Sequence, residues 1–239
     1  MNIKSAIIIG KNILKDQYIQ TAQLDTEILM AKAIDEDRKY IILNDQKNLK
    51  NTNLKYFEKL IKERASRKPI AYLVEQKFFW NSEFTVTNDT LIPRPDTELL
   101  VESILKLTKN KNKMNILDVG VGSGCVLLSI LKEKKNFYGT GIDISKKCIN
   151  ISKKNAIKLK LDSRVRFYKS DVDKFSLGKY DLIVSNPPYI KNYNLKYLER
   201  DVANFEPKLA LDGGLDGLLK IRKVIKKSSE LIKKNGKFI

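Results

Sequence analysis

The chain has 239 residues and a net charge of +18, with two Cys and no His, and this length allows one large domain or one domain with a small companion. The absence of His excludes Ser-His-Asp triads, Cys-His dyads and His-ligated zinc sites, and two cysteines cannot form a disulfide framework or a Cys-only zinc site, so we expect no bound metal. Of the 46 basic residues 38 are Lys, within a general Lys, Ile and Asn bias, which favours a solvated basic surface over a specific nucleic-acid site.

No apolar run reaches the ~18 to 20 residues of a membrane span. Ala6–Ile9 is followed at once by Gly10 and Lys11, so it is too short for the core of a signal peptide. Because two cysteines also fit a reducing compartment, we expect a cytoplasmic protein without a membrane partner.

Residues 1–68 predict a small helical bundle. Apolar residues recur at helical spacing through Leu24–Ile34 and again through Leu54–Ile61, with charged residues between the apolar positions of the second run. Pro69 ends the second run, because proline stops a helix.

Residues 69–92 predict a linker that contains a β-hairpin. The runs Phe78–Trp80 and Phe84–Thr87 are rich in aromatic and β-branched residues, and the polar pair Asn81-Ser82 lies between them. We expect this segment to connect the helical bundle with the main domain.

The third predicted domain, 93–239, alternates strands and helices. We expect strands at Met114–Val119, Phe137–Ile142, Val165–Tyr168, Tyr180–Ser185 and from Lys237 onward, and helices at Cys125–Lys132, Lys146–Leu159 and Leu218–Lys233. Alternation of this kind predicts an α/β fold, with a mostly parallel sheet and helices on both of its faces.

A glycine-rich run, Asp118–Gly124 (Asp-Val-Gly-Val-Gly-Ser-Gly), lies where the first of these strands turns into a helix. Glycines permit a tight turn and a close approach to a ligand. Asp143 ends the next strand, 19 residues after Gly124, where a carboxylate can grip ribose hydroxyls; its alternative is to cap a helix, a role also open to Ser145. The pattern indicates a nucleoside-containing cofactor. It does not separate NAD from S-adenosylmethionine, although the single residue between the last two glycines favours the latter.

Asn186-Pro187-Pro188-Tyr189 follows the buried strand that ends at Ser185. A simple strand-to-loop turn is one interpretation. The other is methyl transfer to a planar amide or arylamine nitrogen: the Asn186 oxygen and the Pro187 carbonyl each accept one N–H. Two acceptors would aim the nitrogen lone pair and favour its developing positive charge, while Tyr189 packs against the flat substrate group. Alone, the motif fits several substrates, including adenine in DNA or RNA.

Further segments resemble the HemK/PrmC family, the methyltransferases of peptide chain release factor glutamine. They are Leu91–Glu98 (Leu-Ile-Pro-Arg-Pro-Asp-Thr-Glu), Phe205-Glu206-Pro207 with Ala210-Leu211, Gly213–Leu218 (Gly-Gly-Leu-Asp-Gly-Leu) and Pro69–Leu73. The resemblance covers nearly the whole chain in the right order. It implies a Rossmann-like class I methyltransferase, with S-adenosyl-L-methionine as cofactor and class I peptide chain release factors as partners.

The resemblance also implies the site residues. The Gly-Gly-Gln glutamine of the release factor would be held by Asn186, Pro187, Pro188 and Tyr189, which we take as the catalytic residues. The cofactor would be bound by Gly120, Val121, Gly122, Ser123, Gly124, Asp143, Asp171, Val172 and Asn186. Arg94, within Pro93-Arg94-Pro95, would line the substrate mouth; the equal alternative is an entry turn with Asp96 as helix N-cap.

The chain departs from the family in three places. Glu75 stands where we expect a glycine, and Val121 where Thr is commoner. The family's sheet continues with further strands after the point that corresponds to Ile239, so we expect the C-terminal strands to be missing and the domain 93–239 to be incomplete.

Three functions follow as hypotheses. The first is a release-factor glutamine methyltransferase, acting as a monomer without a specific nucleic acid. The second is an adenine amino-methyltransferase of RNA or DNA, and the third a truncated module that binds without turnover. Residues 1–85 hold 15 basic and 11 acidic residues, a small excess that favours a protein substrate, because a nucleic-acid enzyme would interleave Arg and aromatic residues there.

Overall fold

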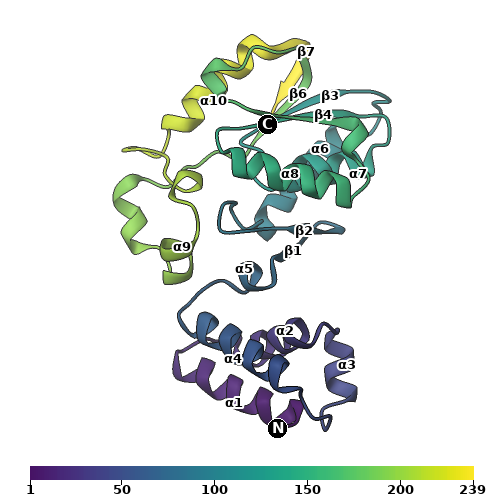
Figure 1. Cartoon of the computed structure of the whole chain (residues 1–239). Helices are drawn as coiled ribbons and strands as arrows, with labels where there is room; N and C mark the ends of the chain where they lie inside the picture. The colour runs from purple at the N-terminus through teal and green to yellow at the C-terminus, as the bar shows by residue number, and fades with distance from the viewer. The chain divides into compact units, whose positions relative to one another are not determined.

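The computed structural model describes all residues from Met1 to Ile239, which form two compact units (Figure 1). The first unit comprises Met1–Glu75 together with Arg200–Phe205, and the second comprises Gln76–Glu199 and Glu206–Ile239. Each unit has a hydrophobic core of its own.

The first unit is a helical bundle, and it extends beyond residues 1–68. Its helices are α1 (Ile3–Asp16), α2 (Ala22–Ile34), α3 (Arg38–Leu43), α4 (Asn51–Ala65), α5 (Ile70–Val74) and α9 (Arg200–Phe205). Leu14, Leu29, Met30 and Phe57 pack in its core at 2% exposure or less. The apolar periodicity of α2 and α4 therefore marks their buried faces, as expected for amphipathic helices.

A buried ion cluster lies within this unit. The Arg64 guanidinium donates to Asp25 at 2.7 Å and to Asp201 at 2.9 Å, and it also donates to the Lys68 carbonyl at 3.1 Å. The Asp25 side chain is only 4% exposed. A charge taken out of water this far needs a partner, so Arg64 is the residue that makes a carboxylate tolerable in this core.

The second unit contains a hairpin and a parallel sheet. In the hairpin, β1 (Gln76–Phe79) pairs antiparallel with β2 (Ser82–Thr85). The five-stranded sheet has the order β5-β4-β3-β6-β7, and all its neighbouring strands are parallel. Its strands are β3 (Asn115–Val119), β4 (Tyr138–Asp143), β5 (Val165–Lys169), β6 (Tyr180–Ser185) and β7 (Ile232–Phe238).

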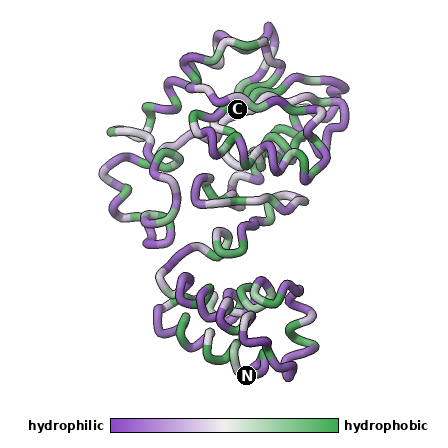
Figure 2. Tube along the Cα trace, in the orientation of Figure 1, coloured by the Kyte–Doolittle hydropathy of each residue, from purple (hydrophilic) through white to green (hydrophobic).

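Helices cover both faces of this sheet, as predicted (Figure 1). Residues of α6 (Glu98–Leu107), α7 (Cys125–Glu133) and α8 (Lys146–Lys158) share one core with Ile116 of β3. On the opposite face α10 (Leu219–Leu231) packs against Leu117 through Val224 and Leu231. Adjacent residues of a strand point to opposite faces, so β3 and β6, which are buried on both sides, contain apolar runs (Figure 2).

Short 3-10 turns complete the second unit: η1 (Pro95–Thr97), η2 (Asp162–Arg164), η3 (Val172–Lys174), η4 (Asn192–Tyr197) and η5 (Lys208–Ala210). Asp96 lies inside η1, and α6 starts after Thr97 without a side-chain cap. The expectation that Asp96 caps this helix was therefore wrong. Glu98, in the first turn, instead accepts a hydrogen bond from the Trp80 backbone at 2.8 Å.

Two predicted boundaries moved. The last strand begins at Ile232 instead of Lys237, and the preceding helix ends at Leu231. The turn signal of this run, Asn235-Gly236, lies inside the strand, and no Gly or Pro stands at the change from helix to strand itself. The segment predicted as a linker is divided between the two units. Leu73 of α5 joins the helical core, whereas Phe79 and Phe84 of the hairpin join the core of the sheet.

Glu75, at the position expected to be glycine, has a left-handed backbone with φ of 60° and ends α5. Glycine adopts this conformation at no steric cost, whereas other residues adopt it only with steric strain. The turn expected from the resemblance is therefore formed here by a non-glycine residue.

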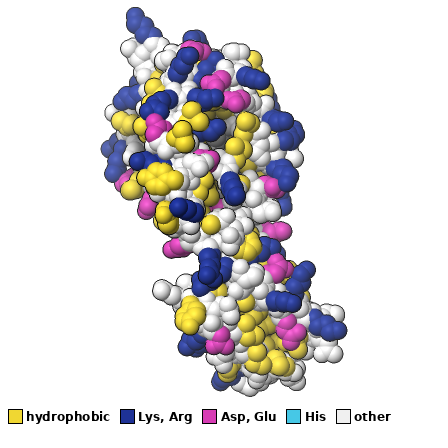
Figure 3. Space-filling model, turned by 90° about the vertical axis from the view of Figure 1, so that its left-hand side faces the viewer, with side chains coloured by type: hydrophobic (Ala, Val, Ile, Leu, Met, Phe, Trp, Pro, Cys, Tyr) yellow, Lys and Arg dark blue, Asp and Glu magenta, His cyan; other side chains and the backbone are white.

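Basic side chains are dispersed over the surface, with acidic ones between them, on the face shown in Figure 3. None of the helices combines the length and the apolarity needed to cross a membrane.

Arg64→Ala is expected to destabilise the helical unit by about 3–5 kcal/mol, because it leaves the buried Asp25 carboxylate unpaired. Arg38→Ala is the matched control: it removes an ion pair with Glu27 whose Arg38 side chain is 49% exposed, a loss of under about 1 kcal/mol. Urea unfolding followed by circular dichroism measures both. Equal losses for the two variants would contradict the prediction.

Candidate active site

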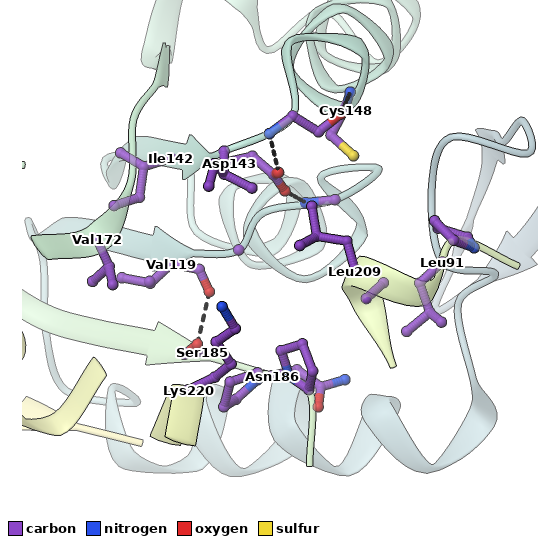
Figure 4. Close-up of a pocket in the computed structure, with 18 of the residues that line it drawn as sticks. Leu91, Val119, Ile142, Asp143, Cys148, Val172, Ser185, Asn186, Leu209 and Lys220 are labelled. Atoms are coloured by element: carbon purple, nitrogen blue, oxygen red, sulfur yellow. Dashed lines mark hydrogen bonds between the residues drawn. The ribbon is translucent and has the colours of Figure 1, made fainter. Parts of the chain in front are cut away.

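A cavity of about 300 Å³ opens at the carboxyl ends of β3, β4 and β6. The strand order reverses at β3, since β4 lies on one side of it and β6 on the other. This is the switch point at which open α/β sheets bind ligands, and the volume is at the small end for a ligand pocket. The lining residues include Val119 and Gly120 of the first strand end, Asp143 of the second and Ser185–Pro188 of the third (Figure 4).

The glycine loop after β3 has the backbone that only glycine adopts freely. Gly120, Gly122 and Gly124 have φ of 79°, 55° and 83°. A Cβ at Gly120 would meet nothing within 4 Å, so the absence of side chains here leaves open space beside the cavity. Of the predicted cofactor residues in this loop, Gly120 and Gly122 line the cavity.

The other loop residues lie behind the cavity wall. Val121 is 5% exposed and packs in the core, Ser123 is buried, and Gly124 caps the N-terminus of α7. The Val121 and Gly120 backbone N–H groups both donate to the Ile142 carbonyl, at 3.0 and 2.9 Å. These residues shape the loop from behind, so the departure at Val121 does not alter the cavity lining.

Asp143 joins the glycine loop to the end of β4. One carboxylate oxygen accepts from the Gly122 N–H at 3.0 Å, and the other from the Ser145 N–H at 2.8 Å (Figure 4). Ser145 caps α8 by accepting from the Cys148 N–H at 3.3 Å, so the helix cap considered for Asp143 belongs to Ser145. Burial raises the pKa of Asp143, while the two backbone donors act against that shift.

Asp118, on β3 beneath the loop, is a second buried carboxyl at 4% exposure. Burial, followed by the charge of Asp143, raises its pKa to about 7. Cys148 lines the cavity, but burial raises the pKa of its thiol to about 11. A thiol that stays protonated at neutral pH is a poor nucleophile.

Two polar residues of α8 hold the loop and were not predicted. Asn155, fully buried, donates to the Ser123 carbonyl at 2.9 Å and exchanges two hydrogen bonds with the Thr85 backbone. Ser152 donates to the Gly122 carbonyl at 2.8 Å. The available signal was a pair of short polar residues at i and i+3 on the apolar face of a Lys-rich helix.

Asp171 and Val172, after β5, both line the cavity. The Asp171 carboxylate accepts from the Asp173 N–H at 3.1 Å and caps η3. Val172 also packs against the core on the α10 side. The cofactor contact that the resemblance implies for Asp171 and Val172 therefore falls on residues that line the same cavity as Asp143.

The Asn-Pro-Pro-Tyr run leaves β6 at the cavity. The Ser185 hydroxyl donates to the Val119 carbonyl at 2.7 Å, which joins the ends of β6 and β3 (Figure 4). Asn186, Pro187 and Pro188 line the cavity. The Asn186 side-chain nitrogen donates to the Thr97 hydroxyl at 3.4 Å, and this orientation leaves the side-chain oxygen without a donor from the protein. Tyr189 does not line the cavity and is 66% exposed.

The Gly-Gly-Leu-Asp-Gly segment supports this run from behind. The Ile190 N–H donates to the Leu211 carbonyl at 3.1 Å, and the Gly213 N–H donates back to the Ile190 carbonyl at 2.8 Å. A Cβ at Gly217 would lie 2.5 Å from the Tyr189 carbonyl oxygen. The glycine is needed for that close backbone approach.

Arg94, the predicted substrate residue, forms an ion pair with Glu206. Other cavity residues to which no role was assigned include Asn88, Asp89 and Leu91 before η1, Pro207, Leu209 and Ala210 around η5, and Lys220, Lys223 and Val224 of α10. Leu91, Pro207 and Ala210 belong to segments that resemble the family, whereas the types of the others carry no recognisable motif. No group of three or more Cys, Asp or Glu side chains is arranged to hold a metal ion.

The glycine loop, the acid at the second strand end and the switch-point cavity define a Rossmann-like domain for a nucleoside-containing cofactor, and the comparisons show that it is a methyltransferase domain. The family model described as Methyltransferase small domain matches residues 95–215, and PrmC N-terminal domain matches residues 5–74. The catalytic domain of hMettl16 superimposes with a TM-score of 0.52 over 63% of this chain and 58% of its own, at 17% identity, which shows the shared fold.

The particular family follows from the curated relatives. The release factor glutamine methyltransferase of Clostridium acetobutylicum is 36% identical over 239 residues, covering 99% of this chain and 84% of the relative. That of Buchnera aphidicola subsp. Acyrthosiphon pisum is 37% identical over 232 residues, covering 97% and 82%. The chain belongs to the release factor glutamine methyltransferase family. This confirms the predicted enzyme class and, with it, S-adenosyl-L-methionine as the cofactor.

The residues present fit this cofactor. Gly120 and Gly122 leave space for a close approach, and the Asp143 carboxylate, with about four acceptor sites of which two are used, can accept from ribose hydroxyls. Val172 and Ile144 supply apolar surface for a flat ring.

Asp143→Ala is expected to weaken S-adenosylmethionine binding by roughly 1.5–3 kcal/mol, the worth of a hydrogen bond to a charged group. Isothermal titration calorimetry measures the affinity. The control is Asp162→Ala, an exposed acid of η2 outside the cavity, which should bind like the parent. Unchanged affinity in Asp143→Ala would remove Asp143 from the cofactor site.

Asp118 predicts a pH-dependent stability. Its folded pKa of about 7 lies above the ordinary 3.8, so the folded state holds a proton that the unfolded state releases. The contribution of Asp118 to the free energy of unfolding is complete at a pH below the ordinary pKa of 3.8, and it is lost as the pH rises through about 7. Urea unfolding at about pH 5 and about pH 8 measures the free energy of unfolding at each pH. From the lower to the higher pH, this free energy should fall more for the parent than for Asp118→Asn. Identical losses would contradict the assignment.

Proposed function

We propose that this chain transfers a methyl group from S-adenosyl-L-methionine to the side-chain amide nitrogen of the glutamine in the Gly-Gly-Gln motif of class I peptide chain release factors. The observation that carries the proposal is the presence of Asn186, Pro187 and Pro188 in the same cavity as the glycine loop and Asp143. Membership of the family supports the substrate, since its curated relatives are named for release factor glutamine.

The mechanism depends on positioning. An amide nitrogen has a delocalised lone pair and is a weak nucleophile. The Asn186 side-chain oxygen has no donor from the protein, so it accepts one N–H group of the substrate amide, and the Pro187 carbonyl accepts the other N–H group. The bound cofactor supplies an activated methyl group, so the protein needs no nucleophile of its own. The two acceptors would direct the lone pair and stabilise positive charge as it develops on nitrogen. The new N–C bond would replace the S–C bond of the donor, S-adenosylhomocysteine would leave, and the nitrogen would release one proton to solvent.

Tyr189 is proposed to contact the substrate at the entrance of the cavity, and Arg94 to line that entrance. The Tyr189 ring is exposed, so it is accessible to the flat amide group or its neighbouring backbone. The Arg94 side chain is 40% exposed beside its partner Glu206. Val121, Ser123 and Gly124 hold the cofactor loop from behind, and Gly120, Gly122, Asp171 and Val172 face the cofactor.

The helical unit is proposed to recognise the release factor. Its region carries only a small excess of basic over acidic residues, which favours a protein surface over nucleic acid. We propose that the chain acts as a monomer, in the cytoplasm, without a specific nucleic acid or a membrane. The two free cysteines suit a reducing compartment.

Mass spectrometry of a class I release factor, incubated with this chain and isotope-labelled S-adenosylmethionine, tests the function. One added methyl group on the Gly-Gly-Gln glutamine is the expected result. RNA and DNA, added in parallel, should bind weakly, lose affinity steeply with salt and remain unmethylated. Methyl incorporation into adenine and none into the release factor would establish the alternative function instead.

Asn186→Ala should lower kcat about a hundredfold to a thousandfold, equivalent to ~2.7–4 kcal/mol, because one of two preorganised acceptors is lost. Binding of the release factor should change much less, since the helical unit is proposed to carry that recognition. Asn192→Ala is the control: Asn192 begins η4, donates to Asp212 at 3.2 Å and does not line the cavity. A parental rate in Asn186→Ala would show that the chemistry has been misplaced.

A further inference from the structure

Glu206 has no part in the proposed chemistry, yet it is the most deeply buried acidic side chain of the ion pairs. The side chain is 1% exposed. One oxygen accepts from the Arg94 guanidinium, and the other accepts from the Ile92 N–H at 3.3 Å. A carboxylate buried to this degree is tolerated only when it is paired and hydrogen-bonded.

The partners of Glu206 connect two segments that are far apart in the sequence. Leu91, directly before Ile92, lines the cavity, and so do Pro207, Leu209 and Ala210, directly after Glu206. Ile92 and Glu206 are separated by 114 positions. Figure 4 shows Leu91 and Leu209 on the side of the cavity away from Val172. One buried carboxylate therefore joins the two pieces of chain that form this wall.

The same segment continues to the catalytic loop. After η5, the Leu211 carbonyl accepts from the Ile190 N–H at 3.1 Å, and the Gly213 N–H donates to the Ile190 carbonyl at 2.8 Å. Ile190 is four positions beyond Asn186. A displacement of the segment at Glu206 is thus transmitted by backbone hydrogen bonds toward the two proposed acceptors.

We propose that Glu206 is a positioning residue, and that its buried ion pair with Arg94 fixes the wall formed by Leu91 and Pro207–Ala210 against the catalytic loop. Arg94 then acts through Glu206 and not by binding the substrate. This inference deepens the proposed function and rests on it for its catalytic readout; its readout of cofactor binding rests only on the cavity.

The burial of the two partners differs, and this predicts a rescue. Arg94→Met leaves the Glu206 carboxylate buried and unpaired, whereas Glu206→Gln leaves Arg94, at 40% exposure, free to be solvated. A Gln at 206 also retains an oxygen for the Ile92 N–H. The single variant Arg94→Met should therefore be the worst of the series, and adding Glu206→Gln to it should restore function.

The test is a double-mutant cycle of the full chain, with Arg94→Met, Glu206→Gln and the double variant. Affinity for S-adenosylhomocysteine is measured by calorimetry, and kcat and KM with a release factor by methyl incorporation. Arg94→Met should lose roughly a hundredfold in kcat and roughly tenfold in S-adenosylhomocysteine affinity, the scale expected for a displacement near 1 Å. The double variant should return to within about fivefold of Glu206→Gln in both.

Two controls separate positioning from folding. Lys106→Met removes an ion pair with Glu102 on α6 in which the side chains are 73% and 46% exposed, and it should behave like the parent. If Arg94→Met does not fold by circular dichroism, Arg94→Lys replaces it in the cycle, since it keeps the charge but loses the guanidinium fork. It should lose less than tenfold in kcat, and a larger loss would contradict the proposal.

The outcomes are distinct. Rescue of both readouts by Glu206→Gln supports the proposal. A double variant as poor as Arg94→Met shows that Arg94 meets the substrate directly, and a parental Arg94→Met shows that the ion pair is idle; either result overturns the proposal. If the parent chain methylates no release factor, the proposed function fails, while the S-adenosylhomocysteine affinities of the cycle still decide the role of Glu206.

Discussion

The hydrogen bond from the Gly122 N–H to the Asp143 carboxylate, at 3.0 Å, determines the shape of the site. It closes the glycine loop onto the neighbouring strand, while the second oxygen takes the Ser145 N–H at the start of α8. A carboxylate has about four acceptor positions, so two remain for hydroxyl donors of a ligand. The Asp143 side chain thus fixes the glycine loop and the start of α8, and it also offers acceptor positions to a ligand. It can do so because parallel strands end at a common edge of the sheet.

A carboxylate in such a place creates an electrostatic problem, because Asp118 lies buried next to it. Two like charges in a medium of low dielectric repel each other strongly. Burial and, to a smaller degree, the charge of Asp143 raise the pKa of Asp118 to about 7, so a proton on Asp118 relieves this repulsion at lower pH. Asp143 has two backbone donors that favour its charged form, so the pair divides its roles by environment: Asp118 can be neutral in the core, and Asp143 can carry charge at the cavity.

The parts that were predictable from sequence are those in which the residue type itself is the signal. Positive φ at three loop glycines, an acid at a strand end and the Asn-Pro-Pro-Tyr run can all be recognised without coordinates. The pairing of Asn155 with Thr85 and that of Glu206 with Arg94 could not be predicted, since each joins residues 70 or more positions apart. The place of Arg200–Phe205 in the helical unit could not be predicted either. It depends on Arg64, which donates both to Asp201 and to Asp25 of α2.

The proposed chemistry explains why residues that do not face the cavity matter for the site. A sulfonium methyl donor removes the need for a nucleophile, so a chain without His can supply what remains, which is orientation. The orientation of the substrate amide depends on how firmly the backbone of Asn186 and Pro187 is held in place. That backbone is held by the Ser185 hydroxyl on one side and by the Ile190 pairing with Leu211 and Gly213 on the other. The glycines at 213 and 217 permit contact distances that no side chain would allow, which makes the segment behind the catalytic loop as much a part of the site as the residues that face the cavity.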